Sequence, residues 1–177
     1  DIVSVDSLFD QETNKVGKLA VTFDDAYNSV FQEAIPVLKT LNVPCTIYIN
    51  GITLNQKPFW RDKIRYLINR NLVEDFITFN QDFCKEKNII KSNFYTQTKN
   101  TKCNSKQIDI FLDEYYEYKK ISIDTMKYGI SDKESLKKNS LITYGNHTYN
   151  HYVLSSLTKE EQEIEIRENQ KLIKNLD

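Results

Sequence analysis

Two short apolar runs near the start of the chain constrain the fold most strongly. The first, K-L-A-V-T-F, leads into an Asp-Asp pair, and the second, V-P-C-T-I-Y-I-N, is rich in β-branched residues. We therefore expect buried strands over 16–25 and 43–50. Between them, 28–41 has the apolar spacing of a helix, and Pro36 is expected to divide it into two pieces. A strand–helix–strand order predicts a parallel sheet.

A third strand is predicted much later in the chain, over 141–145, and a helix follows it. Thr158 and Glu161 have the spacing of a capping box at the start of that helix. Folds of the α/β class place their chemistry at the ends of strands. The polar residues that follow the first and third predicted strands are therefore candidates for a functional site.

The segment 52–139 separates the second and third predicted strands and has its own composition, rich in Lys, Asn, Tyr and Phe. We expect it to be a helical insertion, with amphipathic helices over 59–79 and 107–120 and a weakly structured stretch over 85–106. Ser131 and Glu134 have the spacing of a second capping box before a short helix.

The chain contains only two histidines, His147 and His151, in the run G-N-H-T-Y-N-H-Y. On one turn of helix such residues lie on the same face, so we expect the two imidazoles to share a turn and to bind one metal ion. Taken alone, the spacing also suits surface or capping histidines, and an Asp-Asp pair after a strand often marks a turn. Together they favour a metal site, with a carboxylate as third ligand and one position open to water.

The motifs T-F-D-D and H-T-x-x-H-x-x-L resemble the first two motifs of the polysaccharide deacetylases, the NodB-homology family or carbohydrate esterase family 4. The resemblance covers roughly residues 16–52 and 140–177 and implies an α/β fold, the amino-terminal part of an irregular (β/α) barrel. Matched by motif position, Asp24 would be the catalytic base. Asp25, His147 and His151 would be the metal ligands.

The chain also departs from the family pattern. Ala26 stands where the family usually has Gly after the paired aspartates, which keeps a small residue near the site. The family's later motifs supply an orienting Arg, oxyanion donors and a His general acid, and this chain has no third histidine. We therefore expect 1–177 to be a single domain, incomplete at its carboxy end. Its missing barrel strands would come from a downstream segment or from a second chain.

Composition limits the remaining classes of protein. The chain has 24 basic and 25 acidic residues and a formal charge of −1, which argues against a nucleic-acid partner. No apolar run has the length of a transmembrane helix. The cysteines, Cys45, Cys84 and Cys103, are far apart, which argues against a disulfide framework or a thiolate zinc site. Both a cytoplasmic enzyme and one exported with its signal removed stay open, including one of bacterial cell-envelope polysaccharide metabolism.

The sequence thus predicts a metal-dependent hydrolase that removes an N-acyl group, expected to be N-acetyl, from an amino sugar or polysaccharide. Zinc is the favoured ion, while iron, cobalt, nickel and manganese stay open. No residues that bind the substrate are indicated. One alternative is a related carbon–nitrogen hydrolase such as a sugar deformylase. The other is a non-catalytic carbohydrate-binding half-barrel that needs a partner. The presence of Asp24 favours an enzyme, because a module that only binds does not need the base.

Overall fold

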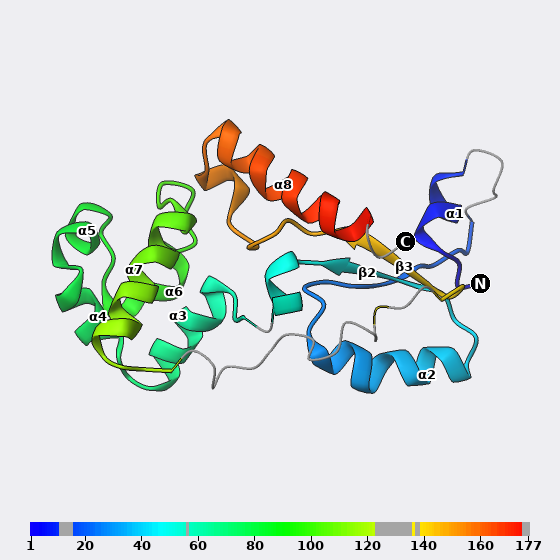
Figure 1. The fold of residues 1–177 in the computed structure, drawn as a ribbon, viewed down its shortest axis with the longest axis horizontal. Coiled ribbons are helices and arrows are strands. Elements are labelled where there is room, and N and C mark those ends of the chain that lie inside the picture. Colours follow the sequence, from blue (N-terminus) through cyan, green and yellow to red (C-terminus); the bar gives the residue numbers. More distant parts are fainter. Residues whose placement is uncertain (11–15, 56, 123–135, 137–138, 175–177) are drawn as a thin grey trace. The chain divides into compact units, whose positions relative to one another are not determined.

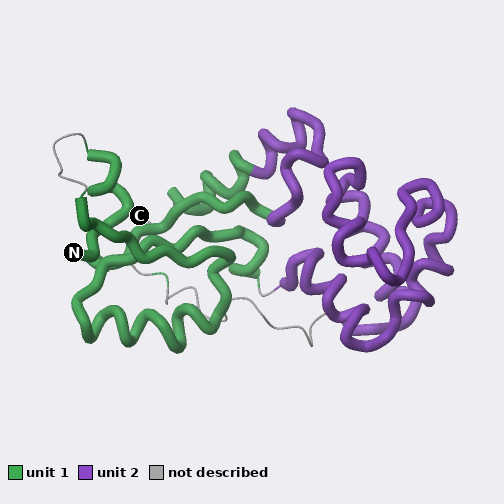
Figure 2. The backbone as a smooth tube through the Cα atoms, turned by 180° about the vertical axis from the view of Figure 1, so that it is seen from behind, with its two compact units in different colours: residues 1–56, 128–149, 166–177 green, residues 57–127, 150–165 purple. Residues whose placement is uncertain are grey.

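The computed structural model describes residues 1–10, 16–55, 57–122, 136 and 139–174 (Figure 1). The chain divides into two compact units. The first unit comprises Asp1–Gln56, Tyr128–Tyr149 and Ile166–Asp177, and the second comprises Lys57–Lys127 and Asn150–Glu165 (Figure 2). The expected boundaries, one domain with an insertion over 52–139, stay a prediction.

The framework of the first unit is a parallel sheet of three strands. In the order of the sheet they are β1 (Val21–Phe23), β2 (Cys45–Ile49) and β3 (Ile142–Asn146). Cys45 of the central strand pairs with Val21 on one side and with Ile142 on the other. The predicted parallel sheet is confirmed, although β1 is shorter than the expected 16–25. Closure of a barrel stays a prediction.

The connection between β1 and β2 is helical, as predicted. A π-helical turn, η1 (Val30–Ala34), runs directly into α2 (Ile35–Thr40). Pro36 lies in the first turn of α2, where a residue without an N–H leaves no helical hydrogen bond unmade. A second helical piece therefore begins beside Pro36, at Ile35, but the expected break is wrong, because the helical backbone continues from η1 into α2. Asn42 follows α2 with a left-handed φ of 53°, a conformation that ends helices.

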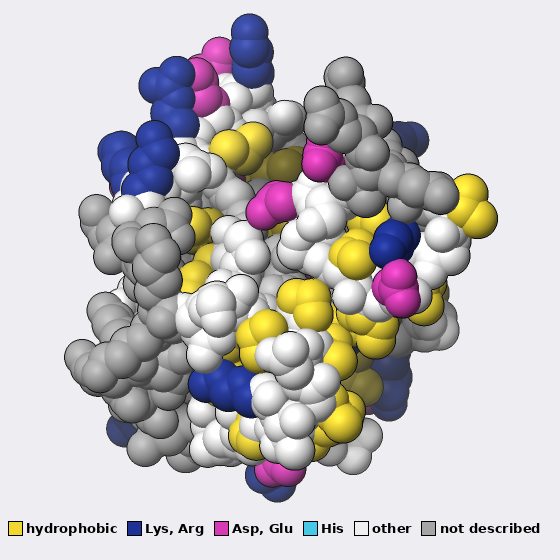
Figure 3. Space-filling model, turned by 90° about the vertical axis from the view of Figure 1, so that its right-hand side faces the viewer, with side chains coloured by type: hydrophobic (Ala, Val, Ile, Leu, Met, Phe, Trp, Pro, Cys, Tyr) yellow, Lys and Arg dark blue, Asp and Glu magenta, His cyan; other side chains and the backbone are white. Residues whose placement is uncertain are grey.

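The core of the first unit lies on β2 and on the helix that precedes it. Cys45, Ile47 and Ile49 of β2 are buried, and Ile35 of α2 belongs to the same apolar cluster. The interpretation of Cys45 as a small core residue is confirmed. This unit also contains α1 (Val5–Phe9) and the 3-10 turn η2 (Gly51–Asn55). Hydrophobic side chains also reach the surface on the face that Figure 3 shows.

The second unit is built from helices. They are α3 (Trp60–Asn69), α4 (Val73–Phe79), α5 (Gln81–Glu86), η3 (Lys91–Asn93), α6 (Phe94–Gln97) and α7 (Ser105–Tyr118). The single helix expected over 59–79 is wrong, because Asn71 with a φ of 56° ends α3 and a new helix follows. The loop or weak structure expected over 85–106 is confirmed for 98–104, whereas two short helical pieces, η3 and α6, lie within the segment and Phe94 is buried. The second expected capping box, at Ser131, lies outside the described residues.

Helices α3 and α7 pack together through the apolar faces predicted for them. The buried side chains of this contact include Trp60, Ile64, Leu67, Ile108, Leu112 and Tyr115. Lys63 is buried beside them, and its Nζ lies 2.7 Å from Asp109 Oδ1 and 2.6 Å from Asp113 Oδ1. Tyr152 donates a hydrogen bond of 2.8 Å to the other oxygen of Asp109. Burial raises the pKa of the Asp109 carboxyl, and Lys63 opposes that shift.

The chain after β3 passes through the 3-10 turn η6 (Leu154–Ser156) into α8 (Lys159–Lys174). The predicted capping box at its start is confirmed by two reciprocal hydrogen bonds. The amide of Glu161 donates to Thr158 Oγ1 at 3.2 Å, and the amide of Thr158 donates to Glu161 Oε2 at 3.1 Å. Among the described residues, no helix has both the length and the apolar character needed to cross a membrane.

Candidate metal centre

The paired aspartates follow β1 directly, in a tight turn. Asp25 and Ala26 both have left-handed backbone conformations, with φ of 69° and 52°, and the amide of Ala26 donates to the carbonyl of Asp24 at 2.9 Å. Ala26 is fully buried, which explains why a small residue follows the pair. The turn leaves the side chain of Asp24 exposed and that of Asp25 with 18% of its surface exposed. The two carboxylates therefore have different surroundings.

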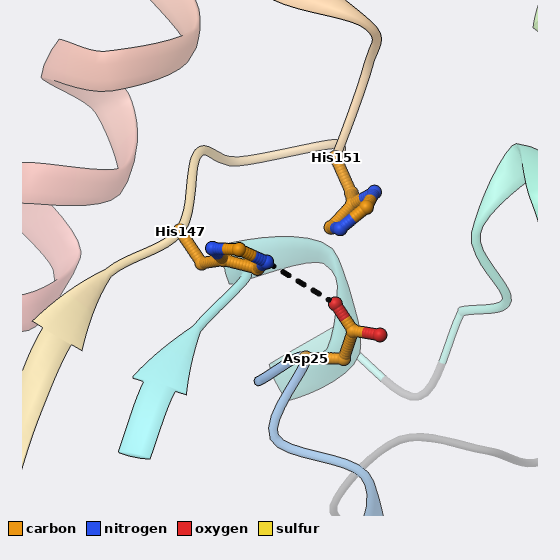
Figure 4. Close-up of side chains that lie close together, drawn as sticks. All are labelled: Asp25, His147 and His151. Atoms are coloured by element: carbon orange, nitrogen blue, oxygen red, sulfur yellow. Dashed lines mark ion pairs between the residues drawn. The ribbon is translucent and has the colours of Figure 1, made fainter. Parts of the chain in front are cut away.

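His147 follows β3 directly and extends its pairing with the central strand. Its amide donates to the carbonyl of Ile49 at 3.0 Å. Its Nε2 lies 3.5 Å from Oδ1 of Asp25, the contact that the dashed line marks in Figure 4. β1 and β3 lie on opposite sides of β2 in the parallel sheet, and their carboxyl ends bring these two side chains together. The sequence predicted this meeting at the strand ends.

The separation of Asp25 and His147 can be compared with the needs of a metal ion. At 3.5 Å, the pair is farther apart than a good hydrogen bond requires. Two ligand atoms on a tetrahedral zinc ion, each about 2.0–2.1 Å from the metal, lie roughly 3.3 Å apart. One carboxylate oxygen and one imidazole nitrogen are also ligand types that zinc accepts. The Asp25–His147 pair therefore fits a shared divalent ion in both chemistry and spacing.

The segment that carries both histidines is not helical, so the expectation of a shared helical turn is wrong. After β3 ends at Asn146, the chain forms a loop, and Thr148 and His151 have left-handed φ values of 67° and 60°. A helix requires right-handed conformations throughout, so these residues cannot continue one. The argument from helical spacing therefore does not apply to His147 and His151.

Asparagine side chains hold the backbone around His147. Asn50, fully buried after β2, donates through Nδ2 to the carbonyl of His147 and, at 2.8 Å, to that of Thr148. Asn146 Oδ1 accepts from the amide of Thr148 at 2.9 Å and from Asn169 Nδ2 at 2.8 Å. Sequence reasoning missed these residues, since a single asparagine reads as a turn former. The one available signal was the place of Asn50 at the end of a predicted strand.

His151 belongs to the second unit, where it contacts three consecutive residues at the start of α3. Its ring centroid lies 5.2 Å from that of Phe59, and its carbonyl accepts a hydrogen bond of 3.0 Å from Trp60 Nε1. Its Nε2 lies 2.9 Å from Nη2 of Arg61. The imidazole of His151, like that of His147, is a ligand type that zinc accepts. The contacts with α3 were not predicted from the sequence.

Comparison with known protein families supports the resemblance that the two motifs indicate. The family model described as "Polysaccharide deacetylase" matches residues 11–75, which include β1, the paired aspartates, α2 and β2. The resemblance indicated by the two motifs is therefore confirmed over this part of the chain, which is similar to the polysaccharide deacetylases. This match supports a deacetylase-type hydrolase. No curated protein and no solved structure matches the chain.

Proposed function

We propose that this protein is a metal-dependent hydrolase that removes an N-acyl group, most simply N-acetyl, from an amino sugar or polysaccharide. The observation that carries the proposal is the pairing of Asp25 and His147 at the carboxyl ends of β1 and β3, 3.5 Å apart. It stands beside a polysaccharide deacetylase match over residues 11–75. A carboxylate and an imidazole at this spacing suit a zinc-type ion.

The proposed third ligand is His151. It follows His147 by four residues, so extended chain separates their Cα atoms by at most about 14 Å. This covalent limit keeps a second imidazole within the neighbourhood of the first, whatever the conformation of the loop. Two imidazoles and one carboxylate make up a common ligand set of catalytic zinc, with a further position for water. Zinc is therefore the proposed ion.

Asp24 is the proposed general base. It precedes Asp25 in the chain, and its side chain is exposed at the end of β1. When bound, a divalent ion lowers the pKa of water and polarises an acyl carbonyl. Asp24 accepts the proton of the attacking water, which contributes roughly a hundred- to ten-thousandfold in rate. Asp25 is assigned to the metal instead, because its Oδ1 faces Nε2 of His147.

The family match over residues 11–75 supports an N-acylated amino sugar as the substrate class. The identity of the acyl group is tested directly. The protein, supplied with zinc, is incubated with oligomers of N-acetylated and of N-formylated amino sugars, and the release of acetate and formate is measured. Release of acetate in preference to formate supports the proposal. A preference for formate contradicts it and favours a sugar deformylase. Binding of the oligomer without turnover, by protein loaded with zinc, contradicts it and favours a carbohydrate-binding module.

Variants separate the roles of the paired aspartates. Asp25→Ala is expected to abolish zinc binding, whereas Asp24→Asn keeps the zinc and loses turnover by roughly a hundred- to ten-thousandfold. Asp82→Asn is the matched control, since Asp82 is an exposed aspartate on α5. If Asp24→Asn released the zinc while Asp25→Ala retained it, the two roles would be reversed.

A further inference from the structure

The partner of His151 in its contact with Arg61 is a hydrogen-bond donor, whereas the partner of a metal-binding histidine is usually an acceptor. A metal-binding histidine usually donates its second ring N–H to a carboxylate or to a carbonyl oxygen. Here the group 2.9 Å from Nε2 of His151 is Nη2 of Arg61. A guanidinium group carries donors and no acceptor. Arg61 therefore donates, and Nε2 of His151 must accept through its lone pair.

This hydrogen bond assigns the protonation of the ring. An Nε2 atom that accepts a hydrogen bond carries no proton, so the proton of the ring lies on Nδ1. Such a ring offers no lone pair to a metal ion through Nδ1, and its Nε2 lone pair is engaged by Arg61. In this arrangement both nitrogens of His151 are committed, one to a proton and the other to the guanidinium.

Either mode of metal binding must break the contact with Arg61. An ion on Nε2 takes the lone pair to which Arg61 donates. An ion on Nδ1 moves the proton of a neutral ring to Nε2, so that two donors then face each other. We propose that Arg61 and the metal ion compete for His151, and that loading of the metal breaks the hydrogen bond between Arg61 and His151. This inference rests on the proposed function, in which His151 is a ligand.

Two further contacts of His151 are compatible with the exchange. Trp60 donates to the backbone carbonyl of His151 at 3.0 Å, and the ring of Phe59 packs against the imidazole at a centroid distance of 5.2 Å. Neither contact uses a lone pair of the imidazole. The residue can therefore stay anchored to the start of α3 while the side chain of Arg61 alone gives up its hydrogen bond with the ring. Arg61 thus sets the metal affinity of the site without being a ligand itself.

Arg61→Met tests the competition, because Met keeps an apolar stem and has no donor. Arg65→Met is the matched control: Arg65 lies one turn further on α3 and contacts Asp62 at 3.4 Å. Both variants remove one positive charge from α3, and the hydrogen bond with His151 is made by Arg61. Zinc dissociation constants are measured by competition with a chromophoric chelator. We expect Arg61→Met to bind zinc about tenfold more tightly than Arg65→Met, which corresponds to about 1.4 kcal/mol.

A spectroscopic readout follows the ring itself. The chain has only two histidines, so a long-range ¹⁵N–¹H spectrum of the imidazoles is simple to assign with His151→Ala. In the metal-free protein we expect His151 to carry its proton on Nδ1 and Arg61→Met to change that pattern. Addition of zinc to the wild type should shift the side-chain N–H signals of Arg61. The more conservative Arg61→Gln repeats the measurements if the Met variant does not fold.

The outcomes separate this inference from the function on which it rests. If His151→Ala leaves the zinc affinity unchanged while Asp25→Ala abolishes it, the proposed ligand set is wrong at His151 and the competition falls with it. If zinc binds through His151 but Arg61→Met and Arg65→Met have equal affinities, only the competition is overturned. If neither the wild type nor Arg61→Met binds zinc, both proposals are overturned.

Discussion

Replacement of Asn50 by Leu should loosen the loop that carries His147. Asn50 is fully buried and donates two hydrogen bonds, to the carbonyls of His147 and Thr148. Its Oδ1 is buried and receives no hydrogen bond from the described residues, so removal of that atom adds no penalty. Loss of each donated bond costs about 2 kcal/mol, and the apolar surface of Leu offsets about 1 kcal/mol. The expected loss of stability is therefore about 3 kcal/mol.

The assay combines thermal unfolding with amide hydrogen exchange. For a chain of this length, about 3 kcal/mol corresponds to a fall in Tm of roughly 6–12 °C. The amide of Thr148, which donates to Asn146 Oδ1 at 2.9 Å, should lose protection, because the carbonyls beside it are no longer held. Zinc affinity should fall as well, since His147 is no longer fixed beside Asp25.

Asn55→Leu is the control for this experiment. Asn55 lies in the turn that follows Asn50, is exposed, and donates to the hydroxyl of Tyr149 at 3.1 Å. Loss of an exposed hydrogen bond of this kind should cost less than about 1 kcal/mol. If Asn50→Leu and Asn55→Leu were equally stable and bound zinc equally well, Asn50 would not position the loop, and the reasoning would be refuted.

Three further predictions concern the fold around the site. Ala26→Gly should change the free energy of unfolding by less than about 1 kcal/mol. Glycine relieves the strain of a left-handed alanine, but the variant loses a buried methyl group and has a more flexible unfolded chain. Thermal melts measure the change, and a loss above about 2 kcal/mol would contradict this reasoning. Lys63→Met should cost about 3–5 kcal/mol in chemical denaturation, since it leaves Asp109 buried without its cation, whereas Lys63→Met with Asp109→Leu should recover most of that loss. Burial raises the pKa of the Cys84 thiol from 9.0 to about 11, so the unfolded state ionises first and stability should fall as the pH rises from 9 to 11. Cys84→Ala should flatten that dependence, and an unchanged slope would contradict the assignment.

The apolar pattern predicted the sheet correctly because a buried strand appears in the sequence as a run of consecutive apolar residues. The run that became β2 is buried at Cys45, Ile47 and Ile49, and removal of so apolar a segment from water favours folding. The acidic pair and His147 were predicted as site residues for the same reason, since each comes directly after a predicted strand. The helical turn predicted through His151 is wrong, because i and i+4 spacing carries no information on backbone conformation. Left-handed residues at Thr148 and His151 break that turn.

Asparagine accounts for most of what the sequence did not reveal. In one role it ends helices: Asn42, Asn71 and Asn88 all have left-handed φ values, between 52° and 56°, directly after α2, α3 and α5. Asparagine tolerates this conformation better than most residues, so it can stand where glycine often does. In the other role it ties the loop of His147 to the sheet, through the side chains of Asn50, Asn146 and Asn169.

The two roles of asparagine look identical in a sequence, because the same short amide side chain serves both. What separates them is burial: Asn50 and Asn169 are fully buried and bond to backbone carbonyls or to another amide, whereas Asn42 is exposed. Burial of such a side chain depends on residues far away in the chain, as the bond between Asn169 and the carbonyl of Ile49 shows. Local pattern therefore found the groups that can bind a metal and missed the groups that hold them in place. Removal of a supporting amide such as that of Asn50 should therefore lower the stability of the fold and the affinity for the metal together.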